Sequence, residues 1–78
     1  SGMSSFSYLK TLPIDFLKID GAFVRDVSAD PVDRAVVEAI QRIGHVMGIE
    51  TIAESVEDEA ALRTLTEIGV DHVQGFHV

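Results

Sequence analysis

The sequence predicts an α/β fold with a parallel sheet, of the kind found in a segment of a (β/α) barrel. Three short apolar runs, at residues 16–19, 51–56 and 70–75, are typical of strands, and segments with helical spacing separate them. Strands that alternate with helices form parallel sheets with right-handed crossovers. Helices on one face of three strands would leave the other face bare, which suits part of a barrel better than a complete doubly wound domain.

Composition limits the chain to one small unit. It has 78 residues, a hydrophobic fraction of 46% and no cysteine, so a disulfide or thiolate metal site is excluded. The net charge of −7 argues against polymeric nucleic acid and anionic membranes as partners. No apolar run approaches the roughly 20 residues of a membrane span, and no signal peptide is visible. We therefore expect a soluble cytoplasmic protein whose sequence segment makes no membrane contact.

The first half of the chain contains two helix signals. Ser4 or Ser5 can cap a short helix that stops before Pro13. After the run at 16–19, residues 21–29 form a connector with a short helical turn around Phe23 and Val24.

The dipeptide Asp30-Pro31 marks the start of a longer helix, because a capping acid precedes a proline at the first helical position. Gly48 is a plausible end of this helix. Glu38 and Arg42 are spaced as an i,i+4 ion pair. The predicted apolar face consists of Val36, Ile40, Ile43 and Met47.

A second long helix follows the run at 51–56. Glu57 or Asp58 opens it, and Gly69 ends it. The residues expected to face the core are Ala61, Leu62, Leu65 and Ile68.

Lys18 is the first polar residue that stands out, because it interrupts an apolar run. A structural interpretation is a snorkelling or ion-paired lysine. The functional interpretations are a cation that orients phosphate or water, and a Schiff-base amine. Asp20 lies two residues further, on the same face of the strand. The two side chains could form a simple ion pair, or the carboxylate could hold the cation in place.

Polar residues also end the other two runs. Glu54 follows a buried run and is a candidate metal ligand or general base. Glu57 has two interpretations, as a residue of the site or as part of a helix start. Asp58 and Glu59 are predicted to be solvated residues at the start of a helix.

The third run ends in Gln74 and Gly75. Gln74 can hold a water or a phosphate oxygen, and Gly75 allows close approach of backbone to a ligand. Phe76 can stack on a base or belong to the core. The three histidines, His45, His72 and His77, show no metal-ligand spacing.

Five segments, in order, resemble the second half of the bacterial EAL domain: SSFSYLK at 4–10, LPID at 12–15, LKID at 17–20, AESVE at 53–57 and QGF at 74–76. Members of this family are modified TIM barrels that hydrolyse cyclic di-GMP to linear pGpG with two Mg²⁺ or Mn²⁺ ions. The resemblance implies that residues 1–78 are the C-terminal portion of such a domain, roughly its last three βα units, without the N-terminal half of the barrel.

The resemblance also implies roles for individual residues. Lys18 matches the active-site lysine that holds the attacking water. Glu54 matches the glutamate that binds metal, directly or through water, and Gln74 matches the glutamine that supports the site near metal and phosphate. Supporting roles at Asp20 and Glu57 complete the implied set. From their residue types, Gly75 and Phe76 are predicted to contact the substrate.

The sequence departs from the family pattern at positions on which catalytic activity depends. The Glu-Ala-Leu signature, the upstream Asn and Glu metal ligands and the paired aspartates are absent, and Ser55 stands where the family usually has glycine. We therefore expect the 78-residue chain alone to be inactive, to bind metal weakly and to self-associate through its open sheet.

Three hypotheses follow for the parent domain. The first is a cyclic di-GMP phosphodiesterase, a homodimer through its barrel and loop, accompanied by GGDEF, PAS or other sensory domains. The second is a degenerate EAL domain that binds cyclic di-GMP or a protein partner without hydrolysis. The third, apart from the resemblance, is a Schiff-base aldolase that uses Lys18.

Overall fold

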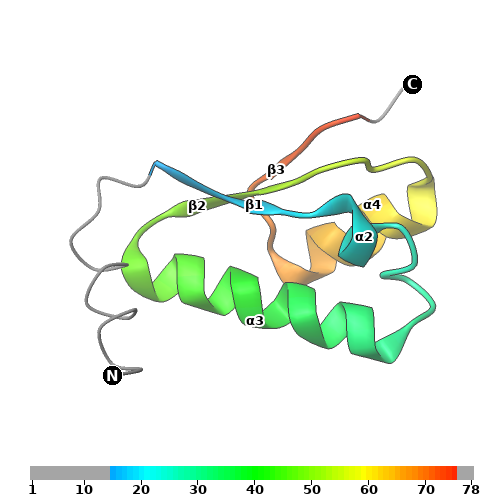
Figure 1. Ribbon diagram of the computed structural model, residues 1–78, viewed down its shortest axis with the longest axis horizontal. Coiled ribbons are helices and arrows are strands. Elements are labelled where there is room, and N and C mark those ends of the chain that lie inside the picture. The colour runs from blue at the N-terminus through cyan, green and yellow to red at the C-terminus, as the bar shows by residue number, and fades with distance from the viewer. Residues whose placement is uncertain (1–14, 76–78) are drawn as a thin grey trace.

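The computed structural model describes residues 15–75 and places three parallel strands over helices that lie on one face (Figure 1). The strands are β1 (Phe16–Ile19), β2 (Glu50–Ala53) and β3 (His72–Val73), in the spatial order β1-β2-β3. The register aligns Lys18 with Ile52, and Ile52 with His72. The helices are α2 (Gly21–Val24), α3 (Pro31–Met47) and α4 (Glu59–Ile68). The prediction of a parallel α/β unit is confirmed, and the helix expected before Pro13 lies outside the described residues.

The core lies between the sheet and the helices. Ile19 of β1, Ala53 of β2, Val37 of α3 and Leu65 of α4 are almost completely buried. On β1, the exposed Phe16 and Lys18 alternate with the half-buried Leu17 and the buried Ile19. Among residues 15–75, helices therefore cover one face of the sheet and no described element covers the other, as predicted.

Helix α3 begins and ends where the sequence predicts. The Asp30 carboxylate accepts the backbone N–H of Val32 at 2.8 Å, and Pro31 follows at the first helical position. Gly48 takes a left-handed conformation with φ of 70° and ends the helix.

The predicted apolar face of α3 is partly wrong. Val37 and Gly44 are the buried residues of this helix, whereas Ile43 is 48% exposed. At Gly44 the helix lies close to β2, since a Cβ atom there would lie 3.0 Å from Thr51 Cγ2 as well as 2.9 Å from the Ile49 carbonyl oxygen. A pattern of large apolar residues does not include glycine, so it misses Gly44 as a buried position, although the predicted Ile40 does pack against the core.

The predicted Glu38–Arg42 ion pair is also wrong. Glu38 pairs with Arg34, from Nε to Oε2 at 3.5 Å, and the same guanidinium lies 3.6 Å from Glu67 of α4. The Arg34 side chain therefore pairs with Glu38 of its own helix and with Glu67 of α4. These groups are solvent-exposed, so each pair contributes about 0–1 kcal/mol.

Helix α4 also follows its prediction. Asp58, rather than Glu57, is the capping residue, and its carboxylate accepts the backbone N–H of Ala61 at 2.7 Å. Ala61 and Leu65 are buried, and Leu62 and Ile68 pack against the core. Gly69 ends the helix with φ of 97°.

Two strands are shorter than predicted. β2 ends at Ala53 because Ser55 has φ of 60°, which an extended strand cannot include. β3 begins later than predicted, at His72. The backbone N–H of Val70 donates to the Leu65 carbonyl at 3.1 Å, so Val70 belongs to the end of α4 and not to the strand. Within residues 15–75, no helix has the length and apolarity that crossing a membrane requires.

Candidate functional site at the carboxyl edge of the sheet

Lys18 lies on the bare face of the sheet, close to the carboxyl end of β1. Its neighbours Leu17 and Ile19 point toward the helices, so alternation places the Lys18 side chain on the opposite, exposed face. The apolar run does not bury this lysine within the described residues, because no layer covers that face. A cation in this position is available to an anionic group that approaches the bare face.

Glu54 and Gln74 are held next to each other by the sheet ladder. The backbone N–H of Glu54 donates to the Ile19 carbonyl at 3.0 Å, and that of Gln74 donates to the Ala53 carbonyl at 2.9 Å. The backbone N–H of Val56 returns to the Gln74 carbonyl at 3.0 Å. The structure thus brings these two predicted site residues to one edge of the sheet, near Lys18, as the parallel arrangement requires.

Asp20 has a contact that sequence reasoning did not anticipate. Its carboxylate accepts the backbone N–H of Ala22 at 2.8 Å and caps α2. Within residues 15–75, no ion pair joins Asp20 to Lys18, so neither predicted form of that pair is found there. The described contact is a structural one.

Of the other predicted residues, the structure describes Glu57 and Gly75. Glu57 is exposed in the loop between β2 and α4, directly before the capping residue Asp58. Gly75 has φ of 86°, a conformation that glycine adopts without strain. Phe76 and His77 lie outside the described residues.

The segments that follow the three strands meet at Ser55. A Cβ atom at Gly21 would lie 2.8 Å from both Cβ and Oγ of Ser55, and one at Gly75 would lie 3.3 Å from the Ser55 Cα atom. The start of α2 and the segments that follow β2 and β3 are therefore in close contact beside Glu54. Sequence reasoning missed the role of Gly21, whose only signal is a glycine directly after the LKID segment.

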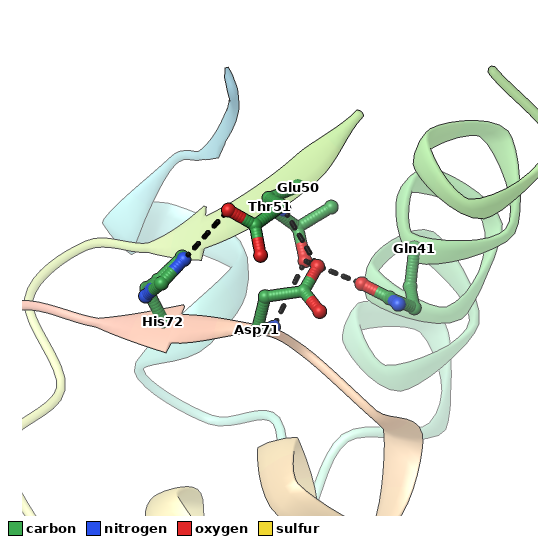
Figure 2. A network of polar contacts seen from close by, with 5 residues as sticks. All are labelled: Gln41, Glu50, Thr51, Asp71 and His72. Atoms are coloured by element: carbon green, nitrogen blue, oxygen red, sulfur yellow. Dashed lines mark hydrogen bonds and ion pairs between the residues drawn. The ribbon is translucent and has the colours of Figure 1, made fainter. Parts of the chain in front are cut away.

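A polar network stabilises the opposite, amino-terminal edge of the sheet (Figure 2). The Asp71 carboxylate accepts the Thr51 backbone N–H at 2.9 Å, and the Thr51 hydroxyl also contacts the Gln41 side chain. His72 lies 3.3 Å from the Glu50 carboxylate and packs edge-on against the Phe16 ring. In parallel α/β barrels this edge serves stability, whereas the carboxyl edge carries the chemistry.

A groove of about 710 Å³ also opens on the outer surface, between α3 and α4. Its lining mixes charges of both signs, including Arg34, Arg42, Glu67 and Asp71. None of Lys18, Glu54 or Gln74 lines it. The groove is therefore separate from the carboxyl edge of the sheet.

The described residues do not form a complete metal site. Among residues 15–75, no three His, Asp or Glu side chains converge as a metal ion would require. The Glu54 carboxylate is a hard oxygen donor that suits a divalent cation, but one carboxylate does not make a site. Any metal at this edge would need ligands from outside the described residues.

The model of the EAL domain family matches residues 1–78. The chain belongs to the EAL domain family. It is 44% identical over 78 residues to the cyclic di-GMP phosphodiesterase PdeB of Shewanella oneidensis, of which it covers 9%. The chain therefore spans about a tenth of the length of such curated relatives.

Solved EAL structures agree with this assignment. The EAL domain of Mycobacterium smegmatis DcpA matches with a TM-score of 0.83 and 40% identity, over 90% of this chain and 31% of that one. The Pseudomonas aeruginosa MucR phosphodiesterase in complex with c-di-GMP gives 0.82 and 40%, over 88% of this chain and 28% of that one. The three-stranded unit is thus a portion of an EAL barrel, as the sequence motifs predict.

Proposed function

We propose that this chain is the C-terminal portion of a domain that hydrolyses cyclic di-GMP to linear pGpG in bacterial signalling, in the cytoplasm. The observation that carries the proposal is the position of Lys18, Glu54 and Gln74 at one edge of the sheet in a member of the EAL family. Relatives such as PdeB carry the name of cyclic di-GMP phosphodiesterases.

Each residue has a role that suits phosphodiester hydrolysis. In this reaction water adds to phosphorus, one P–O bond breaks, and the leaving oxygen takes a proton. The exposed ammonium of Lys18 can orient the attacking water and offset phosphate charge. The Gln74 side-chain amide can donate to a phosphate oxygen or accept from a water.

Glu54 would contribute a carboxylate to a divalent metal, directly or through water. We propose Mg²⁺ or Mn²⁺ as the metal, and two such ions would supply the nucleophilic hydroxide and neutralise phosphate charge. Most of their ligands would come from the rest of the barrel, because the described residues supply no group of three. We propose supporting roles for Asp20 and Glu57 and substrate contacts for Gly75 and Phe76.

Hydrolysis of cyclic di-GMP by the complete EAL domain tests this proposal. The measurement is pGpG formation with Mg²⁺ or Mn²⁺, for the unmodified domain and for the Lys18→Ala and Glu54→Ala variants. Each variant should lose activity by about 100-fold or more, since each removes a charged group from the site. Glu59→Ala is the matched control, because this exposed residue lies in the first turn of α4.

The outcomes separate the hypotheses. Turnover that disappears in both site variants but not in Glu59→Ala supports the phosphodiesterase. Binding of cyclic di-GMP without turnover would contradict it and favour a receptor. The isolated 78-residue chain should show no turnover, and pGpG formation by that chain would contradict the need for further ligands.

A further inference from the structure

We propose that Ser55 is a positioning residue that sets the spacing between the carboxyl ends of β1 and β2 through a side-chain contact with Gly21. Its catalytic meaning rests on the proposed function, because Lys18 and Glu54 lie on the two segments that the contact joins. The contact itself does not depend on any activity.

The backbone of Ser55 is the first observation. Ser55 has φ of 60°, and it is the one residue other than glycine with a positive φ within the described part of the chain. L side chains rarely adopt this conformation. It turns the chain sharply after Glu54, so the residue after the carboxylate points toward the neighbouring loops.

The contact with Gly21 is the second observation. A Cβ atom at position 21 would lie 2.8 Å from Ser55 Cβ and 2.8 Å from Ser55 Oγ, well inside van der Waals contact. Gly21 begins α2 directly after Asp20, and it is buried. The Ser55 side chain therefore packs directly on the Gly21 backbone, and only a hydrogen atom fits between the two segments.

Gly75, after β3, also lies against Ser55. A Cβ atom there would lie 3.3 Å from Ser55 Cα and 3.5 Å from Ser55 N. These are backbone atoms, so the contact toward β3 does not depend on the Ser55 side chain. The side chain of Ser55 thus acts specifically on the β1 side, where Lys18 lies.

The spacing matters for chemistry because both segments carry site residues. Glu54 directly precedes Ser55, and its backbone N–H donates to Ile19, between Lys18 and Asp20, at 3.0 Å. A group inserted between Gly21 and Ser55 would push these strand ends apart. A misplacement of about 1 Å at a reacting centre can cost on the order of 100-fold in rate.

The test is Gly21→Ala in the complete EAL domain, in three backgrounds at position 55. With Ser55 present, the substitution should lower kcat for cyclic di-GMP by about tenfold or more and change KM by less than about threefold. Adding Ser55→Gly should restore most of kcat, because the Ser55 side chain is removed. Adding Ser55→Ala should not, because the Cβ atom at 2.8 Å remains.

A second measurement is independent of turnover. Urea midpoints for the same variants should show a destabilisation by Gly21→Ala that vanishes with Ser55→Gly and persists with Ser55→Ala. All kinetic measurements are made where circular dichroism shows each variant to be fully folded. If Gly21→Ala alone does not fold, folding and turnover of the Gly21→Ala, Ser55→Gly double variant carry the test.

The outcomes are distinguishable. An equal effect of Gly21→Ala in all three backgrounds, on both kcat and midpoint, would overturn the contact. Rescue of the midpoint with no change in kcat would overturn the positioning role. An unmodified domain without turnover would contradict the proposed function, and the midpoints would still decide the contact.

Discussion

The Asp71 carboxylate extends the hydrogen-bond ladder of the sheet, because its Oδ2 atom accepts the backbone N–H of Thr51 at 2.9 Å. The Asp71 backbone N–H donates in return to the Thr51 hydroxyl at 3.2 Å. Thr51 is completely buried, whereas β3 begins one residue after Asp71. A side chain therefore satisfies a buried backbone group that the short third strand does not reach.

Asp71→Ala should destabilise the EAL domain by about 1–3 kcal/mol, because it leaves the buried Thr51 N–H without its acceptor. Urea unfolding gives the free energy of unfolding of each variant. Asp71→Asn is the matched control, since its side-chain oxygen can still accept this hydrogen bond, and it should lose less than half as much. Equal losses for the two variants would contradict the ladder role and indicate that the negative charge itself matters.

The cap formed by Asp20 leads to a second prediction. Asp20→Ala should lower the free energy of unfolding by about 1 kcal/mol, since the Ala22 backbone N–H loses its acceptor. Asp20→Asn should stay within about 0.3 kcal/mol of the unmodified domain, because asparagine caps helices equally well. Chemical denaturation of the three proteins measures this difference. A loss in Asp20→Asn as large as in Asp20→Ala would mean that the charge of Asp20 serves another group.

The sequence predicts those features of the fold that depend on residues close together in the chain or on the parallel order of the strands. The caps of α3 at Asp30 and Gly48 depend on local side-chain and backbone preferences, so they could be read directly. The adjacency of Glu54 and Gln74 follows from parallel pairing, which brings strand ends to one edge.

The remaining features depend on contacts that no local pattern encodes. The buried face of α3 includes Gly44, where a Cβ atom would lie 3.0 Å from Thr51 Cγ2 of β2, on a different element of the fold. β2 ends before the left-handed Ser55, and β3 begins only after Val70, whose backbone N–H bonds to Leu65 of α4. A complete set of metal ligands could not be predicted, because residues 15–75 form no group of three His, Asp or Glu side chains that could hold an ion.

Asp33 gives a prediction about pH. Desolvation raises the pKa of this carboxyl, and the nearby carboxylates of Asp30 and Asp26 raise it further. The folded state therefore binds this proton more tightly than the unfolded state. The resulting stabilisation is present below the unfolded pKa, about 3.9, and is lost as pH rises through the folded pKa.

Asp33→Asn removes this titration. The free energy of unfolding of the variant, relative to the unmodified domain, should therefore rise as the pH increases from below the unfolded pKa, about 3.9, through the raised folded pKa. Urea unfolding over that range measures the slope. Repeating the comparison in an Asp26→Asn background should give a smaller slope, because one of the repelling carboxylates is gone. A slope of the opposite sign would contradict the statement that folding raises the pKa of Asp33.

Gly44 lies where α3 approaches the sheet, and two effects compete there. Alanine is favoured over glycine inside a helix by about 1 kcal/mol. However, a Cβ atom at position 44 would lie 2.9 Å from the Ile49 carbonyl oxygen and 3.0 Å from Thr51 Cγ2. Overpacking of this kind costs about 1–3 kcal/mol. Because the Ile49 contact is with backbone, which cannot move aside without shifting β2, we expect Gly44→Ala to destabilise the domain by about 1 kcal/mol.

Two further variants separate the steric cause from a general intolerance at this end of α3. Thr51→Ser removes the Cγ2 methyl group, so Gly44→Ala should cost less in that background than in the unmodified domain. Gly48→Ala meets no atom within 4 Å, so its cost should come only from the left-handed backbone with φ of 70°, and Thr51→Ser should not change it. Thermal and urea unfolding of this set would contradict the steric account if Gly44→Ala proved stabilising, as helix propensity alone requires.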